Sequence, residues 1–286
     1  MTHSEHLDFE QKGYLLLRNP QHQLQDFLEI TERWGHDFVQ IQNLSGTGPQ
    51  QIVGSHLGRT PLPGKTDVFL NAGHNASYPL PLHGELYYQM PYPPALLCFY
   101  CETPPLEQGE TLLCNGQALF QALPTSIQQL FLEQDLVYTR HSPLAVWQKD
   151  YQTQDAKALL QFLKSVPIEG EIHPETGELT THYTCSALRH FRGDWCFMNN
   201  LIPFALRERD EPQATRSRVR LANGQALPAA ALDALLTCSE ALQHSIAWQK
   251  GDILLVDNRW VLHGRRALLP GPRTLYLRMA QHCRTP

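Results

Sequence analysis

The chain has 286 residues, of which 42% are hydrophobic and 18% charged, so its composition is that of a globular protein and excludes a disordered or fibrous one. It carries 23 Lys and Arg against 28 Asp and Glu, and a net charge of −5 argues against non-specific binding to nucleic acid or to an anionic membrane. No apolar stretch approaches the about 20 residues of a membrane span, and the polar, acidic N-terminus does not resemble a secretory signal.

In chain order, the residue pattern predicts a strand over 13–18, a helix over 23–35, a Gly- and Pro-rich loop over 43–66, a buried strand over 95–101 and a helix over 116–134 that is interrupted near Pro124. Helices over 154–165 and 229–243 and strands over 195–198, 252–257 and 273–280 follow. This mixture predicts a mainly β fold with α decoration, a sandwich or barrel with helices outside it.

No clear boundary divides the chain, so we expect a single domain over 1–286. The Arg-rich segment 205–228 is predicted to be an exposed insertion, for which a solvated arm is favoured over an anion-binding patch.

The pair Cys98 and Cys101 has the C-x-x-C spacing, but no second pair follows, which favours core thiols on one strand over zinc binding. Scattered cysteines of odd number then indicate a reducing compartment, most simply the cytoplasm.

The residues that indicate chemistry are His83, Glu85 and His263. His83 and Glu85 are two apart, so in an extended segment both side chains point to the same face. One opposing imidazole completes two histidines and a carboxylate, the ligand set of non-haem Fe(II) oxygenases, which leaves positions open for co-substrate and O2. An H-x-E pair alone is weak evidence, because a chain with 14 His and 28 acidic residues is expected to contain one by chance.

The surrounding motifs strengthen the hypothesis. Residues 248–264 read WQKGDILLVDNRWVLHG, and with Arg265 they resemble the C-terminal half of the taurine dioxygenase-like (TauD/TfdA-type) Fe(II)- and 2-oxoglutarate-dependent oxygenases. The run LHGELYYQMPYPPALLCFYCETPPLEQGETLLCN and the later GDWCFMNNLIPF also resemble that family. The resemblance extends from about residue 80 to about residue 280 and is closest to the amino-acid-hydroxylating, antibiotic-biosynthesis branch.

The resemblance implies a double-stranded β-helix (jelly roll) core, with His83, Glu85 and His263 as iron ligands and with Fe(II), 2-oxoglutarate and O2 as the cofactor set. It also implies that Thr111 lies near the distal carboxylate of 2-oxoglutarate. Two arginines are candidates for gripping that carboxylate, Arg273 and Arg278. They are five positions apart and so face opposite sides of a strand. The resemblance favours Arg273, because in the antibiotic-biosynthesis branch a Pro-Arg pair closely follows H-G-R, as Pro272-Arg273 does here.

Two departures from the family pattern stand out. Many members have Asp where this chain has Glu85, although Glu occurs in the amino-acid-hydroxylating branch. Gln108 replaces the first glycine of a Gly-Gly pair. The resemblance implies that a carboxylate at the second ligand position favours hydroxylation or desaturation over halogenation.

The substrate implied is a small amino acid or amino-acid-derived unit, either free or bound to a carrier protein. Candidate substrate contacts are Asn199, Asn200, Tyr87, Tyr88 and Arg265, although core packing explains the two tyrosines equally well. The alternatives are a non-catalytic metal- or ligand-binding relative and a zinc hydrolase, and the complete set of motifs argues against both. The oligomeric state is left open.

The segment 43–78 precedes the first metal-binding motif and is rich in Gly and Pro. We expect it to be a lid over the substrate, because mobile loops commonly close such sites against water. Its polar residues His56, Asn71, His74 and Asn75 are candidates for contacts with a zwitterionic substrate.

Overall fold

The computed structural model describes residues 2–40, 60–70, 77–89, 92–151, 153–213 and 216–284. Its largest element, the large sheet, is antiparallel with the strand order β1-β15-β6-β17-β4-β3, and β2 also pairs with β17. The strands are β1 (Tyr14–Leu17), β2 (Gly35–Phe38), β3 (Thr60–Pro61), β4 (Val68–Leu70), β6 (Leu96–Thr103), β15 (Ile253–Asp257) and β17 (Thr274–Cys283).

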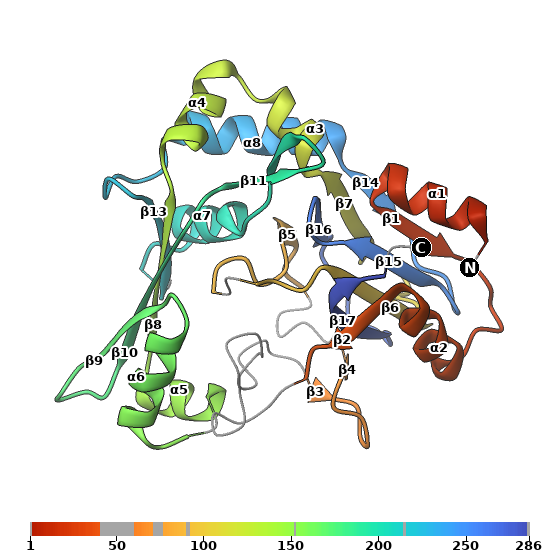
Figure 1. Cartoon of the computed structure of the whole chain (residues 1–286), viewed down its shortest axis with the longest axis horizontal. Coiled ribbons are helices and arrows are strands. Elements are labelled where there is room, and N and C mark those ends of the chain that lie inside the picture. The colour runs from red at the N-terminus through yellow and green to blue at the C-terminus, as the bar shows by residue number, and fades with distance from the viewer. Residues whose placement is uncertain are drawn as a thin grey trace.

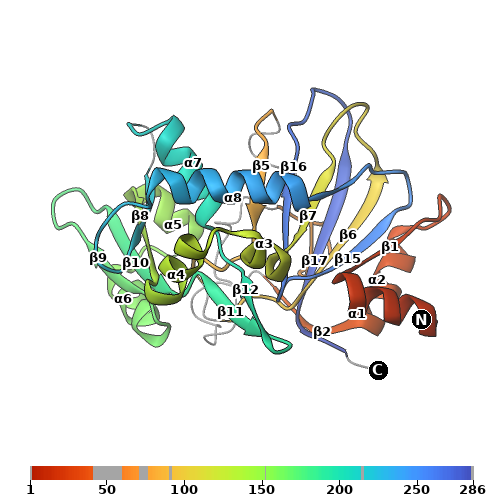
Figure 2. The ribbon, with the colours of Figure 1, turned by 90° about the horizontal axis from the view of Figure 1, so that it is seen from above.

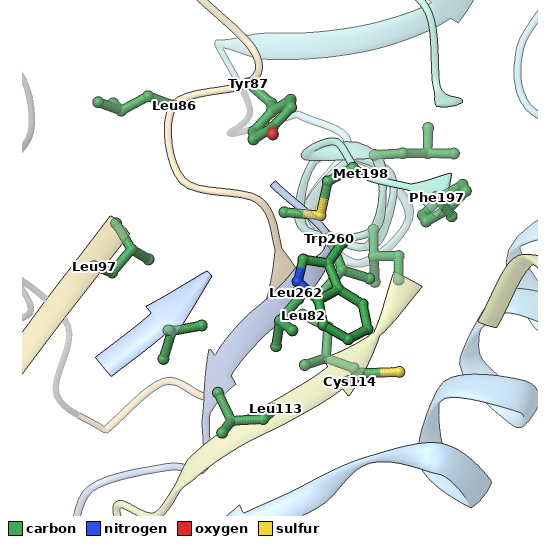
Figure 3. Packing of buried hydrophobic residues seen from close by; sticks show 14 of the residues in the cluster. Leu82, Leu86, Tyr87, Leu97, Leu113, Cys114, Phe197, Met198, Trp260 and Leu262 are labelled. Atoms are coloured by element: carbon green, nitrogen blue, oxygen red, sulfur yellow. The ribbon is translucent and has the colours of Figure 1, made fainter. Parts of the chain in front are cut away.

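A second antiparallel sheet, the small sheet, has the order β14-β7-β16-β5. Its strands are β5 (Leu80–His83), β7 (Thr111–Asn115), β14 (His244–Ile246) and β16 (Val261–Arg265). Leu113 lies on the face of the small sheet that carries His263, whereas Leu82 and Leu262 lie on its other face, close to Met198 (Figure 3). The mainly β fold with a double-stranded β-helix core, predicted from the sequence, is therefore confirmed.

A third sheet, the side sheet, has the order β13-β8-β10-β9 and lies at the opposite end of the molecule from α1 and α2 (Figures 1 and 2). Its strands are β8 (Leu136–Ser142), β9 (Glu169–Ile172), β10 (Leu179–Cys185) and β13 (Ser217–Leu221), and a separate hairpin joins β11 (Leu188–Phe191) to β12 (Asp194–Phe197).

The helices cover the sheets. They are α1 (His3–Lys12), α2 (Leu24–Trp34), α3 (Gly116–Ala122), α4 (Thr125–Glu133), α5 (Leu144–Asp150), α6 (Ala156–Ser165), α7 (Leu201–Asp210) and α8 (Ala229–Leu242). The predicted interruption at Pro124 separates α3 from α4, because proline has no backbone N–H to continue the helix. The buried side of α2, with Phe27 and Trp34, packs against the outer face of the large sheet.

Strand β6 shows how one strand serves two cores. Leu96, Cys98 and Tyr100 belong to the cluster under α1 and α2, whereas Leu97, Phe99 and Cys101 face the cluster between the sheets. This alternation follows from the two-residue period of a strand. Cys98 and Cys101 are buried on opposite faces and are free thiols, as the preference for core thiols predicted.

Two expectations about the chain's organisation need correction. Segment 205–228 is not an exposed insertion, because it contains the end of α7 and the strand β13, whose Val219 and Leu221 are each 2% exposed. Segment 43–78 is not one continuous loop, since β3 and β4 extend the large sheet within it. Residues 41–59 and 71–76, and with them His56, Asn71, His74 and Asn75, lie outside the described residues, so the lid stays a prediction.

One hydrophobic cluster takes side chains from both halves of the chain, from Val39 to Met279, and the single domain over 1–286 stays a prediction. Within the described residues, no helix is both long enough and apolar enough to cross a membrane.

Candidate active site

The small sheet brings the two predicted histidine ligands together. In the pairing of β5 with β16, His83 lies directly opposite His263, and their ring centroids are 4.3 Å apart. Directly paired residues of antiparallel strands project to the same face. Glu85 follows β5 by two residues, and its Oε2 lies 3.4 Å from Nε2 of His263. Each of the three buried residues offers a ligand atom within 4.8 Å of the other two.

The geometry of this triad fits a divalent ion. Nδ1 of His83 donates a hydrogen bond of 2.8 Å to the carbonyl oxygen of Pro81, so Nε2 is the ring nitrogen whose lone pair can bind a metal. Two ligand atoms at right angles, each about 2.1 Å from one ion, lie about 3 Å apart, close to the distance between Glu85 and His263. Two imidazole nitrogens and one carboxylate on one face suit Fe(II).

Asn258 holds the Glu85 turn in place, a role that the sequence reasoning missed. Its Oδ1 accepts a 2.8 Å hydrogen bond from the Glu85 N–H, and its Nδ2 donates to the carbonyl oxygens of Glu85 and Pro94 at 3.3 and 2.7 Å. Asn258 is fully buried, and the next residue of the turn, Leu86, has a φ of 67°. The sequence signal for this role was the pair Asp257-Asn258, which belongs to the motif over residues 248–264.

A first cavity of about 390 Å³ opens on one side of the triad. Besides Glu85 and His263, the side chains that line it include Phe99, Thr111, Arg265 and Arg273. Burial, and to a lesser degree the neighbouring charge of Arg265, lower the pKa of Arg273 to about 10. Burial also lowers the pKa of Arg265, so the electrostatics of the cavity favour an anion beside these cations.

Thr111 is oriented within the first cavity by Trp248. The indole Nε1 donates a hydrogen bond of 3.1 Å to Oγ1 of Thr111. That acceptor role leaves the Thr111 hydroxyl proton available to donate to an anionic oxygen. Thr111 and Arg273 were predicted to serve the same carboxylate, and the structure brings both into one cavity.

Arg278, the other predicted candidate, does not line this cavity. Its guanidinium donates to Oδ2 of Asp67 at 2.6 and 2.8 Å and to Oγ1 of Thr31 at 2.8 Å, and it stacks on the ring of Phe38. The parity argument correctly put the two arginines on opposite faces. Arg278 lies on the outer face of the large sheet, which α2 covers. The prediction that Arg278 could bind the co-substrate is therefore wrong.

A second cavity of about 330 Å³ adjoins the triad, shares Leu80, Glu85, Pro203 and Arg207 with the first, and includes both His83 and Glu85. Its remaining polar lining comes from Tyr88, Arg140, Asn200, Arg207 and Ser217. Tyr88 and Asn200 were predicted substrate contacts, whereas Arg140 and Arg207 were not singled out for that role. The sequence feature that could have identified Arg140 as a substrate contact is its place on the inward face of β8, where an arginine is unusual.

The structure places two predicted substrate contacts elsewhere. The side chain of Asn199 is 1% exposed and bonds to the backbone, donating to Ala187 at 2.7 Å and accepting from Leu201 at 2.8 Å. Tyr87 is buried, its hydroxyl donates to the carbonyl oxygen of Asn258, and burial raises its pKa. Neither lines a cavity at the triad, because both are used to fix the surrounding backbone. Arg265 lines the first cavity and donates to the Tyr78 carbonyl at 2.8 Å.

Gln108 departs from the glycine that the family resemblance implies, and its backbone shows the consequence. Its φ is 57°, in the left-handed region, and Gly109 beside it has a φ of 75°. A side chain in this region costs about 1–2 kcal/mol relative to glycine. Gln108 therefore keeps the left-handed backbone of the turn, and this lowers the stability of the fold somewhat.

Comparisons with known proteins point to one enzyme family. The family model of the taurine catabolism dioxygenase TauD, TfdA family, matches residues 5–280. A clavaminate synthase-like protein of Arabidopsis thaliana is 26% identical over 292 residues, covering 96% of this chain and 84% of the relative.

Solved structures share the fold at low sequence identity. PvcB, an Fe, alpha-ketoglutarate dependent oxygenase from an isonitrile synthetic pathway, aligns with a TM-score of 0.55 and 16% identity over 95% of this chain and 77% of its own. An asparagine oxygenase in complex with Fe(II), 2S,3S-3-hydroxyasparagine and succinate aligns with a TM-score of 0.53 and 13% identity over 97% of this chain and 76% of its own.

Proposed function

The chain belongs to the TauD/TfdA dioxygenase family, and from this premise we propose that it hydroxylates an unactivated C–H bond of a small amino acid or amino-acid-derived substrate. Family membership confirms the predicted enzyme class, a dioxygenase that works with Fe(II), 2-oxoglutarate and O2. The hydroxylation, the substrate class and a place in specialised metabolism belong to the proposal.

We assign Fe(II) to His83, Glu85 and His263. The observation that carries the proposal is that Thr111 and Arg273 line the same cavity as Glu85 and His263 of the triad. When bound, iron and 2-oxoglutarate supply with O2 the oxidising power for a C–H bond, and the co-substrate leaves as succinate and CO2. The protein supplies the arrangement of the groups.

Each side chain then has a defined task. Arg273 grips the distal carboxylate of 2-oxoglutarate through parallel hydrogen bonds, and Thr111 adds a hydroxyl donor. A bound carboxylate also relieves the unfavourable burial of the Arg273 charge. The pairing of His83 with Pro81 fixes its ring, and Asn258 fixes the backbone of Glu85. Glu85 is itself the third protein ligand, and a carboxylate at this position favours hydroxylation over halogenation.

Succinate formation tests the proposal. Purified protein with Fe(II), ascorbate and 2-oxoglutarate is incubated in air with a pool of free amino acids, and succinate and substrates with one added oxygen are measured by mass spectrometry. We expect both products from the wild type and neither from His83→Ala. A non-catalytic relative or a zinc hydrolase would form no succinate, and a desaturase would give products lighter by two hydrogens.

A further inference from the structure

The second cavity carries information about the form in which the substrate arrives. It joins the metal ligands His83 and Glu85 to the inward face of the side sheet. Its volume of about 330 Å³ is at the small end for ligand pockets, as a single amino acid requires.

The register of the side sheet explains why Arg140 faces this cavity. In one row across the sheet, Tyr138 of β8 lies opposite Val219 of β13 and Tyr183 of β10, and all three side chains are buried in the core. Two residues further along β8, Arg140 lies opposite Ser217. Since residues two apart on a strand share a face, Arg140 projects to the same side as Tyr138. The row next to the core is therefore polar.

Among the described residues, no carboxylate is in ion-pair contact with Arg140, and the charge of the half-buried Asp150 acts on it only from further away. Its Nη1 donates to the neutral side chain of Gln89 at 2.7 Å, and its guanidinium carbon lies 5.4 Å from the ring centroid of Tyr88. Across the ranges that the structure describes, no carboxylate forms an ion pair with Arg140 within 4.0 Å. Arg207 also lines this cavity, but its charge is paired with Glu211 at 4.0 Å and its side chain is 62% exposed, so Arg140 is the cation that the cavity encloses. A half-buried cation of this kind favours an anionic ligand.

Asn200 supplies a complementary group. It is 4% exposed, and its Oδ1 is buried with no hydrogen-bond donor among the described residues. Its backbone N–H donates a hydrogen bond of 3.1 Å to the hydroxyl of the buried Tyr138, which fixes the backbone from which the side-chain amide projects. A buried acceptor without a donor is costly, and an ammonium group would satisfy it.

We propose that the substrate is a free α-amino acid whose carboxylate is held by Arg140 and whose ammonium group is held by Oδ1 of Asn200. This inference rests on the proposed function and deepens it. A thioester to a carrier protein has neither the negative charge nor the second oxygen that a guanidinium grips in parallel. The substrate is therefore bound free, before any activation of its carboxyl group. Any step that activates or couples this carboxyl group would therefore have to follow the hydroxylation.

The test compares acids with their methyl esters. Protein loaded with Mn(II) and N-oxalylglycine, which do not turn over, is titrated calorimetrically with each of the proteinogenic L-amino acids and with the methyl ester of each. The variants are Arg140→Gln, Arg140→Lys and Arg218→Gln. Arg218 neighbours Ser217 on β13 but lies opposite Thr139 and is exposed, so its loss is a matched change of charge away from the cavity.

We expect at least one acid to bind the wild type and Arg218→Gln about 10- to 100-fold more tightly than its ester. Arg140→Gln should lose this preference while its binding of the ester is unchanged, and Arg140→Lys should retain part of it. Equal binding of acid and ester by the wild type, an undiminished preference in Arg140→Gln, or no binding by any acid would overturn the inference. Succinate formation from Fe(II) and 2-oxoglutarate by the wild type tests the proposed function separately.

Discussion

Two arginines, one directly before β17 and one within it, allow a sharp test of the co-substrate site, because the structure gives them different surroundings. Arg273 lines the first cavity, whereas Arg278 is 6% exposed on the other face and bonds to Asp67, Thr31 and the Leu28 carbonyl. Replacement by alanine should therefore change the affinity for 2-oxoglutarate in one variant and the stability of the fold in the other.

The magnitudes follow from the contacts. Arg278→Ala leaves Asp67, only 17% exposed, without its cation, and breaking a buried ion pair costs about 3–5 kcal/mol. Because Asp67 keeps some solvent, we expect the lower end, about 3 kcal/mol of unfolding free energy. Arg273→Ala removes a charge that burial and Arg265 disfavour, so stability should hold or rise slightly. Its loss of a charge-assisted contact should weaken 2-oxoglutarate binding about 100-fold.

Urea unfolding and anaerobic calorimetry with Mn(II) and 2-oxoglutarate measure the two quantities on the same preparations. Arg273→Lys is the matched variant, since it keeps the charge but loses the paired geometry, and it should be intermediate in affinity. The reasoning is refuted if Arg278→Ala weakens 2-oxoglutarate binding while Arg273→Ala leaves it unchanged.

Four further outcomes are expected. His83→Ala and His263→Ala should each abolish iron binding and turnover, and stoichiometric iron in either purified variant, measured by elemental analysis, would contradict the triad. Asn258→Ala should lower metal affinity about 10- to 100-fold in a competitive chelator titration, because Glu85 loses its support; unchanged affinity would remove that role. Gln108→Gly should raise the unfolding free energy by about 0.5–1 kcal/mol in urea, since glycine accepts the left-handed backbone, and a loss of stability would exclude strain there. If segment 43–78 is a lid, its amide hydrogens should become protected from exchange when substrate and 2-oxoglutarate bind, whereas equal exchange in both states would exclude the lid.

The parts of the fold that the sequence predicted correctly depend on short-range patterns. The strand over 95–101 is a continuous apolar run, and the break at Pro124 follows from the chemistry of proline. The triad was predictable because the spacing of His83 and Glu85 and the motif around His263 are local features. Their meeting depends on the pairing of β5 with β16, which the family resemblance implied and periodicity alone could not.

The remainder required long-range information. Segment 205–228 was interpreted as exposed because of its arginines, yet Val219 and Leu221 alternate with them and face the core once β13 pairs with β8. Likewise, parity on β17 indicated that only one of Arg273 and Arg278 enters the site. Choosing between them from the residues alone required knowing that α2 and Asp67 cover one face and the small sheet the other.

Strand β5 is the edge of the small sheet, four residues long and paired only with β16 among the described strands. Short edge strands fray readily, since half of their backbone hydrogen-bonding groups have no strand partner. An ion bound by both His83 and His263 would cross-link β5 to β16 and so stabilise this edge. Leu80, at the start of β5, lines both cavities beside the triad, so fraying would loosen both at once. Metal binding would thus precede the binding of 2-oxoglutarate and substrate. The metal-free protein would bind neither of these two ligands, although the rest of the chain would remain folded.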